Sequence, residues 1–304
     1  MQEHKVQYLE SEIFFLSDGL FVKYENNSFH HDRKRLFVFR SFPDLINSLI
    51  NNAELHFERH NRLLNESVNI FEKMSKPVLA QVNPNVLQYY PRAATSEITV
   101  PDHTILLYEM NQKKIRICDP FIVNNKGIAE CYDGFEDLEK LRNGISNYFC
   151  FTPKSDYMSV PREKRIKIVK ENLIRFRNGQ VNKDYSIGMP GLFQFLNDLS
   201  NLSLHEIKNK SLWIETVFVI NGNMMFINDY LLELLYAYFK HIGIFPQKII
   251  DMIIDVKHQW EYAYKLVLKI GYKAPEMHSS KAVDILYRVL EMQNQCFDMV
   301  ISYF

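Results

Sequence analysis

The sequence predicts an α+β protein in two parts, and the distribution of apolar residues is the basis for both. Up to about residue 155, short β-branched and aromatic runs alternate with segments of helical spacing. From residue 156 to residue 304 nearly all the apolar spacing is helical. The polar, proline-containing stretch 152–156 is therefore the expected boundary between a mixed domain, 1–155, and a helical domain, 156–304.

The first domain is expected to begin with a short helix over 13–20 that ends at Gly19, because glycine tolerates the left-handed conformation of a helix C-cap. Apolar spacing from Pro43 to about Ser75 predicts further helix. Strands are expected at 20–24, 35–39, 76–82 and 148–151.

In the second domain, a turn at 186–191 is expected to open a helix. Helical stripes are expected within 166–174, 192–199, 231–239, 249–269 and 281–303.

Residues 102–120 are the most informative stretch, because two apolar runs flank the polar sequence Asn-Gln-Lys-Lys and so predict a β-hairpin. A hairpin brings its outer ends together, here His103 and Asp119. A carboxylate beside an imidazole fixes the tautomer and stabilises imidazolium, as a general base requires. The pair needs a register that turns both side chains to one face, since a slip of one residue separates them. The alternative is a histidine at a strand edge and an aspartate that starts an Asp-Pro turn.

Alternation along the second strand places Asp119 on the same face as Ile115 and Ile117, where a carboxylate needs a partner. Cys118 then faces the other way and is expected to be a structural thiol. Cys131 is expected in a glycine-containing loop, 131–134, from which it could serve as the nucleophile of a peptidase-like hydrolase.

Tyr89 and Tyr90 lie between the strand at 76–82 and the hairpin. They are interpreted either as the wall of a substrate cleft or as a cover over the edge of the core.

No metal site or cofactor is predicted. His30, His31 and Asp32 are adjacent on the chain and are expected on a loop surface. His56 and His60 have the spacing of one helix face, but Phe57 occupies the place where a zinc-protease motif requires glutamate. The sequence has neither a Walker loop nor a GxGxxG motif, so no nucleotide cofactor is expected.

Composition excludes several classes of function. Lys+Arg and Asp+Glu both number 36, so nothing favours nucleic acid as a partner. No apolar run reaches the ~18 residues that a membrane span needs. The four cysteines have neither metal-knuckle nor disulfide-framework spacing, and the first residues do not resemble a signal peptide. A reduced, cytoplasmic protein is the expectation.

The order of segments resembles the butirosin biosynthesis protein H family, which joins a papain-like N-terminal domain to a helical one. The resemblance rests on Pro77–Leu79, Leu87–Tyr90, the run from Asp102 to Tyr108 and the run Ile117–Pro120. In the helical half it rests on 186–199 and 230–265.

The resemblance implies acyl transfer by a Cys–His–Asp arrangement, from an acyl or peptidyl carrier-protein thioester to a small-molecule amine. The setting would be antibiotic or nonribosomal-peptide biosynthesis. His103 matches the family's general base and Asp119 the residue that orients it. The family's cysteine is expected in a helix before 9–15, and residues 1–8 contain none.

Several alternatives follow from that missing cysteine. The protein could be a catalytically silent pseudoenzyme that binds or assembles; otherwise a longer N-terminus, or another residue, would supply the nucleophile. The acyl group, the acceptor and the oligomeric state, homo-oligomer included, stay open.

Overall fold

The computed structural model shows a mixed α+β protein, as predicted. It describes residues 10–25, 36–37, 42–53, 57–61, 77–90, 103–111, 113–123, 129–151, 160–201, 231–243, 245–273 and 275–304. The chain divides into two compact units, one of residues 54–158 and one that joins residues 1–53 to 159–304. We call them the sheet unit and the helical unit.

This division differs from the expected one at the N-terminal side. The second boundary lies close to the proline-containing stretch at 152–156, but the first 53 residues group with the helical half. Their apolar side chains explain why, since Phe15, Val22 and Tyr24 share a core with residues of the C-terminal helices. Sequence periodicity finds elements but does not tell which core each element joins.

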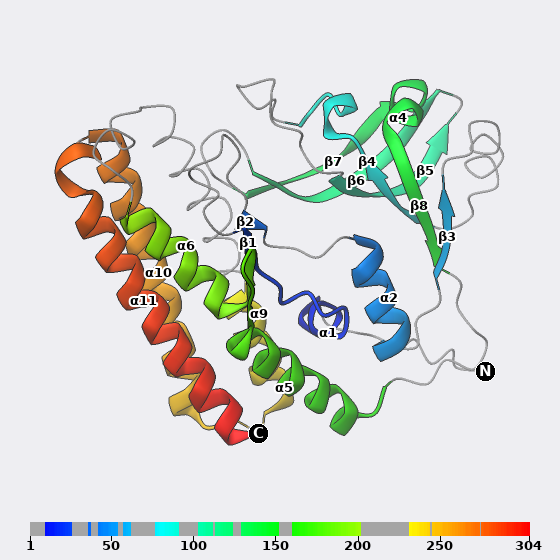
Figure 1. Cartoon of the computed structure of the whole chain (residues 1–304). Coiled ribbons are helices and arrows are strands. Elements are labelled where there is room, and N and C mark those ends of the chain that lie inside the picture. The colour runs from blue at the N-terminus through cyan, green and yellow to red at the C-terminus, as the bar shows by residue number, and fades with distance from the viewer. Residues whose placement is uncertain are drawn as a thin grey trace. The chain divides into compact units, whose positions relative to one another are not determined.

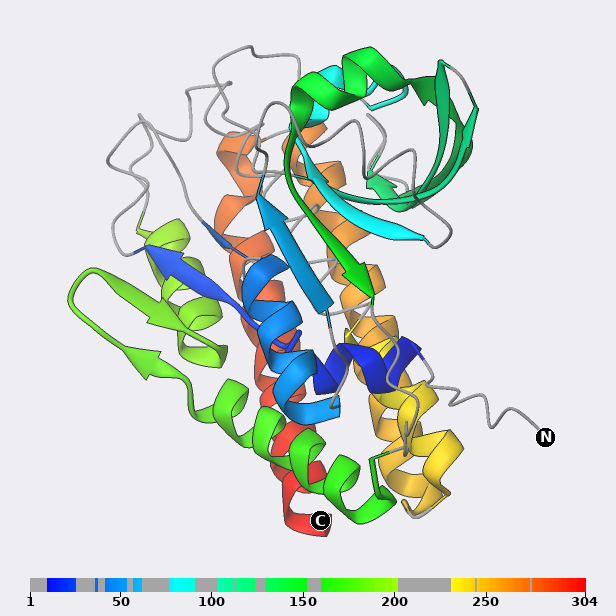
Figure 2. The same ribbon diagram turned by 90° about the vertical axis from the view of Figure 1, so that its right-hand side faces the viewer.

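The sheet unit is built on six antiparallel strands in the order β3-β8-β4-β5-β6-β7. Figure 2 shows that these strands curl strongly, with a short helix across one end. The strands are β3 (Phe57–Asn61), β4 (Val78–Val82), β5 (His103–Asn111), β6 (Lys114–Val123), β7 (Ala129–Asp137) and β8 (Ile145–Phe151). The short helix is α4 (Leu138–Gly144), and a 3-10 turn, η2 (Pro84–Val86), follows β4.

One face of the sheet carries the apolar core of this unit, and we call it the inner face. Alternate residues of β4, β5 and β6 are buried there, as a half-buried antiparallel sheet requires. The core comprises Val78, Ala80, Val82, Leu87, Ile105, Leu107, Ile115, Ile117, Leu138, Leu141, Ile145 and Tyr148.

The helical unit packs helices around a second core (Figure 1). It also carries a four-stranded sheet in the order β2-β1-β10-β9. The strands are β1 (Lys23–Glu25), β2 (Leu36–Phe37), β9 (Gln180–Val181) and β10 (Tyr185–Ile187). The helices are α1 (Glu10–Leu16), α2 (Phe42–Ala53), α5 (Arg162–Asn178), α6 (Met189–Ser200), α9 (Leu231–Ile242), α10 (Gln247–Lys273) and α11 (Pro275–Tyr303).

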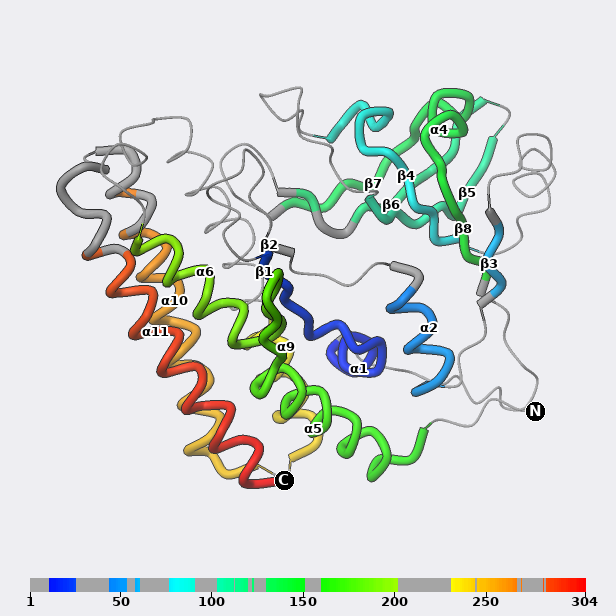
Figure 3. Tube along the Cα trace, in the orientation of Figure 1, coloured from blue at the N-terminus to red at the C-terminus, as the bar shows by residue number. Residues whose placement is uncertain are grey.

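All five helices expected in the second half are confirmed, and the last two are longer than predicted. α10 and α11 pack alongside each other over much of their length (Figure 3). Trp260 of α10 is fully buried and donates from Nε1 to Gln293 Oε1 of α11 at 2.6 Å. That bond satisfies the indole N–H and the amide oxygen inside an apolar core.

Three local expectations are wrong. Residues 57–61 form β3 rather than helix, so His60 lies on a strand, and its ring stacks on Tyr148 with centroids 5.0 Å apart. Residues 131–134 lie within β7 rather than in a loop. After α1, the left-handed residue is Asp18, with φ of 59°, rather than Gly19.

Gly19 is constrained by space instead, because a Cβ there would lie 2.7 Å from the Phe14 ring. The segments containing His30 to Asp32 and His56 lie outside the described residues.

Among the described helices, none is both long and apolar enough to cross a membrane.

Candidate functional site

The predicted hairpin is formed by β5 and β6, and its pairing contains a bulge. Near the turn Glu109 pairs with Arg116, whereas beyond the bulge Leu107 pairs with Ile117. Tyr108 is the extra residue. If the pairing of Glu109 with Arg116 continued along the strands without a bulge, Asp119 would lie opposite Leu106. The side chain of Asp119 would then point to the face of Leu106, which is opposite to that of His103. The bulge restores the shared face, so that His103 and Asp119 both point inward.

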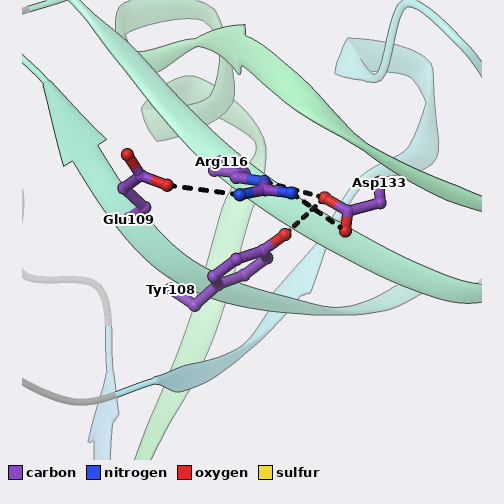
Figure 4. Close-up of polar contacts among 4 residues, drawn as sticks. All are labelled: Tyr108, Glu109, Arg116 and Asp133. Atoms are coloured by element: carbon purple, nitrogen blue, oxygen red, sulfur yellow. Dashed lines mark hydrogen bonds and ion pairs between the residues drawn. The ribbon is translucent and has the colours of Figure 1, made fainter.

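Side chains on the outer face hold the bulge in place (Figure 4). The hydroxyl of Tyr108 donates to Asp133 Oδ1 of β7, and Arg116 Nε donates to the same carboxylate at 2.9 Å. Arg116 also contacts Glu109 Oε2 at 3.5 Å and lies over the Tyr108 ring. This network joins all three strands at the bulge. Its members are largely exposed, so water screens each contact and its contribution to stability is small.

The imidazole and carboxylate meet at the end of the inner face. His103 Nε2 lies 2.6 Å from Asp119 Oδ2, and Asp119 has 0% exposure. A carboxylate this buried favours the tautomer in which Nε2 carries the proton and donates to it. Nδ1 is then the unprotonated nitrogen of the neutral ring, and it has no hydrogen-bond partner among the described residues. His103 can therefore accept a proton at Nδ1 while Asp119 stabilises the resulting cation.

Tyr89 and Tyr90 both reach this pair. Tyr89 Oη donates to Asp119 Oδ2 at 3.0 Å, and the Tyr90 ring lies 4.9 Å from the His103 ring. Burial, followed by the charge of Asp119, raises the pKa of Tyr89, so this phenol stays protonated and donates. Burial likewise raises the pKa of Tyr90. Both rings also pack against the core of the sheet unit, as the second of the two interpretations expects.

Tyr132 and Glu136, which the sequence did not single out, complete the site. The rings of Tyr132 and Tyr89 stack with centroids 3.8 Å apart, and Tyr132 Oη donates to Glu136 Oε1 at 3.1 Å. A Cβ on Gly134 would lie 2.6 Å from Tyr132 Oη, so the absence of a side chain lets the ring lie along its own strand. Alternation across 129–137, had that segment been recognised as a strand, would have placed these residues on one face.

The described thiols lie away from the dyad. Cys118 pairs with Asp133, outside the face of Asp119, and burial raises the pKa of its thiol. Cys131 lies on the same outer side of β7. Cys150 pairs with Val78, at the opposite end of β4 from Val82, which pairs with His103.

The fourth thiol, Cys296, is buried in the helical unit. The structure therefore places an acid–base pair without a thiol beside it among the described residues.

Metal ligation has little support in the described ranges, where no group of three or more His, Cys, Asp or Glu could hold an ion. Asp119 and Glu136 are the buried carboxylates of this face, and each accepts a hydrogen bond from a tyrosine.

No protein-family model matches the chain, and no curated protein matches it either.

Proposed function

We propose that the sheet unit is a papain-like acyl-transfer centre in which His103 is the general base and Asp119 orients it. The substrate would be an acyl or peptidyl carrier-protein thioester and the acceptor a small-molecule amine, as in specialised-metabolite or peptide biosynthesis. The observation that carries the proposal is the 2.6 Å contact between His103 Nε2 and buried Asp119, which leaves Nδ1 to accept a proton.

The chemistry can proceed by direct transfer, in which the acceptor amine attacks the thioester carbonyl. The new C–N bond forms, the amine proton passes to His103 Nδ1, and the C–S bond breaks. The imidazolium then returns the proton to the leaving thiolate. Such a step needs a positioned base and no thiol of the protein, and it is consistent with the location of the described cysteines.

Tyr89 and Tyr90 are proposed to line the place where the acyl group lies. Their rings offer apolar surface beside the base, and the hydroxyl of Tyr89 is engaged by Asp119 rather than available to the substrate.

A carrier protein loaded with an acyl-phosphopantetheine thioester, incubated with the full chain and a primary amine, tests the proposal. Mass spectrometry should detect the amide, and His103→Ala should reduce its rate by about 10²- to 10⁴-fold, the usual contribution of a general base. His60→Ala is the matched control, since His60 is a histidine of the same sheet that stacks on Tyr148. Equal rates in the two variants would contradict the role of His103.

A catalytically silent binding or assembly module is the second candidate, and the position of the thiols favours it. If the wild-type chain yields neither amide nor covalent adduct with thioesters of several chain lengths, this candidate takes precedence. His103→Ala would then affect stability alone.

A further inference from the structure

A pocket in the helical unit has the chemistry of an anion site. It has a volume of about 290 Å³ and is lined by Glu12 of α1, Arg162 and Arg165 of α5, and His241 and Ile242 of α9. That volume lies just below the range of about 300–1,000 Å³ that is typical of small-molecule pockets, so it suits a small ion. All three helices belong to the same unit, so the pocket is formed within one core.

The lining carries an excess of positive charge. Arg165 makes an ion pair with Glu12, whose side chain is 3% exposed, so these two charges compensate each other. Arg162 donates to the carbonyl of Ile242 at the end of α9. Neither Arg162 nor His241 has an acidic partner among the described residues. A guanidinium has five N–H donors, so Arg162 keeps donors for a ligand.

Two buried donors close to the charged lining residues strengthen this interpretation. Tyr238, with 1% exposure, lies one turn before Ile242 on α9, and its Oη has no hydrogen-bond partner within the described part of the chain. Its phenol lies within electrostatic reach of Glu12, Arg165 and Arg162. Arg165 Nε is buried and unpartnered as well. Seven buried side-chain atoms of the described residues lack a hydrogen-bond partner, and these two are the ones grouped with the cationic lining. A buried donor without a partner is costly, so an acceptor bound here would be favourable.

We propose that this pocket binds a small oxyanion, held by Arg162, Arg165 and His241 of its lining. A phosphate group and a carboxylate share the required chemistry, since both present oxygen acceptors to a guanidinium. The proposal concerns the helical unit alone and does not depend on acyl transfer by the sheet unit.

Isothermal titration of the full chain with inorganic phosphate, and separately with acetate, tests the proposal at constant ionic strength. Saturable binding of at least one anion is expected, and the anion that binds identifies the source as phosphate or carboxylate. Arg162→Gln should weaken that binding by at least about tenfold, as loss of a charge-assisted hydrogen bond implies. Lys240→Gln is the matched control, because it removes one charge from the residue next to His241 but lies outside the lining.

Circular dichroism verifies folding of each variant. Should Arg162→Gln fail to fold, His241→Gln replaces it, since this exposed side chain belongs to the same lining. No saturable binding of either anion by the wild-type chain would overturn the proposal. Equal weakening by the lining variant and by Lys240→Gln would overturn it too, because long-range charge alone would then account for the effect.

Discussion

Of two single-residue deletions in β5, one should break the His103–Asp119 pair and the other should leave it intact. Thr104 follows His103 and pairs with Gln81. Its deletion moves His103 into the place of Thr104, on the opposite face of the strand, while Ile105 and Leu107 keep their places in the core. The carboxylate of Asp119 then loses its imidazole partner.

Deletion of Tyr108 should leave the pair intact. Tyr108 is the extra residue of the bulge, so its removal makes the pairing of Leu107 with Ile117 continuous with that of Glu109 with Arg116. The inward direction of His103 does not change. What is lost is the outer hydrogen bond to Asp133.

The burial of the lost contacts sets how much the two deletions should differ in their free energy of unfolding. Loss of the hydrogen bond from His103 to a carboxylate with 0% exposure should cost about 1.5–3 kcal/mol. Loss of the Tyr108 contacts should cost less than that, because they are exposed and screened by water. Each deletion also shortens β5 by one residue, so comparing the two cancels most of that shared cost.

Urea unfolding measures both free energies, and the ring proton of His103 in an NMR spectrum reports the contact itself. We expect the Thr104 deletion to lose the downfield ring proton and the Tyr108 deletion to keep it. If both deletions lose it, the bulge does more than absorb an extra residue and our account of the register is refuted.

Three further predictions concern single side chains. Asp119→Ala should cost about 3–5 kcal/mol in urea unfolding, because it strands two donors, whereas Asp119→Asn should cost about 1 kcal/mol; similar values for both would argue against a buried charged acceptor. Gly134→Ala should cost about 1–3 kcal/mol through its clash with Tyr132, and a change in near-ultraviolet circular dichroism should accompany it; an unchanged spectrum would show that the ring has room. Burial raises the pKa of Tyr238 from 10 to about 12, so wild-type stability should fall by about 2–3 kcal/mol as pH rises through that window. Tyr238→Phe should abolish that part of the fall and gain about 1 kcal/mol at neutral pH; parallel pH curves would contradict the assignment.

The hairpin shows which features of the candidate site could be predicted from the sequence. Alternating apolar residues and the polar turn predicted β5 and β6, and the buried face of Ile115, Ile117 and Asp119 followed from strand periodicity. The bulge at Tyr108 could not be predicted, because it depends on contacts with Arg116 and Asp133 from neighbouring strands.

Segments with weak local signals account for the remaining differences. Residues 57–61 contain one apolar residue, Phe57, and so carry no periodicity of their own. Their antiparallel pairing with β8 makes them a strand. Gly134 suggested a loop, but here it makes room for the Tyr132 ring. The grouping of α1 and β1 with the helical unit depends on long-range packing of Phe15 and Tyr24, which no local pattern reveals.

The central claim is that buried Asp119 holds His103 with Nε2 protonated and Nδ1 available as a base. NMR of the full chain with ¹⁵N-labelled histidine tests it most directly, with Asp119→Asn as the perturbation and Glu58→Gln, beside His60, as its control. We expect a proton on Nε2 of His103 that shifts in the first variant and not in the second. A proton on Nδ1 of the neutral ring would contradict the account. So would a His103 signal that is the same in the wild type and in Asp119→Asn.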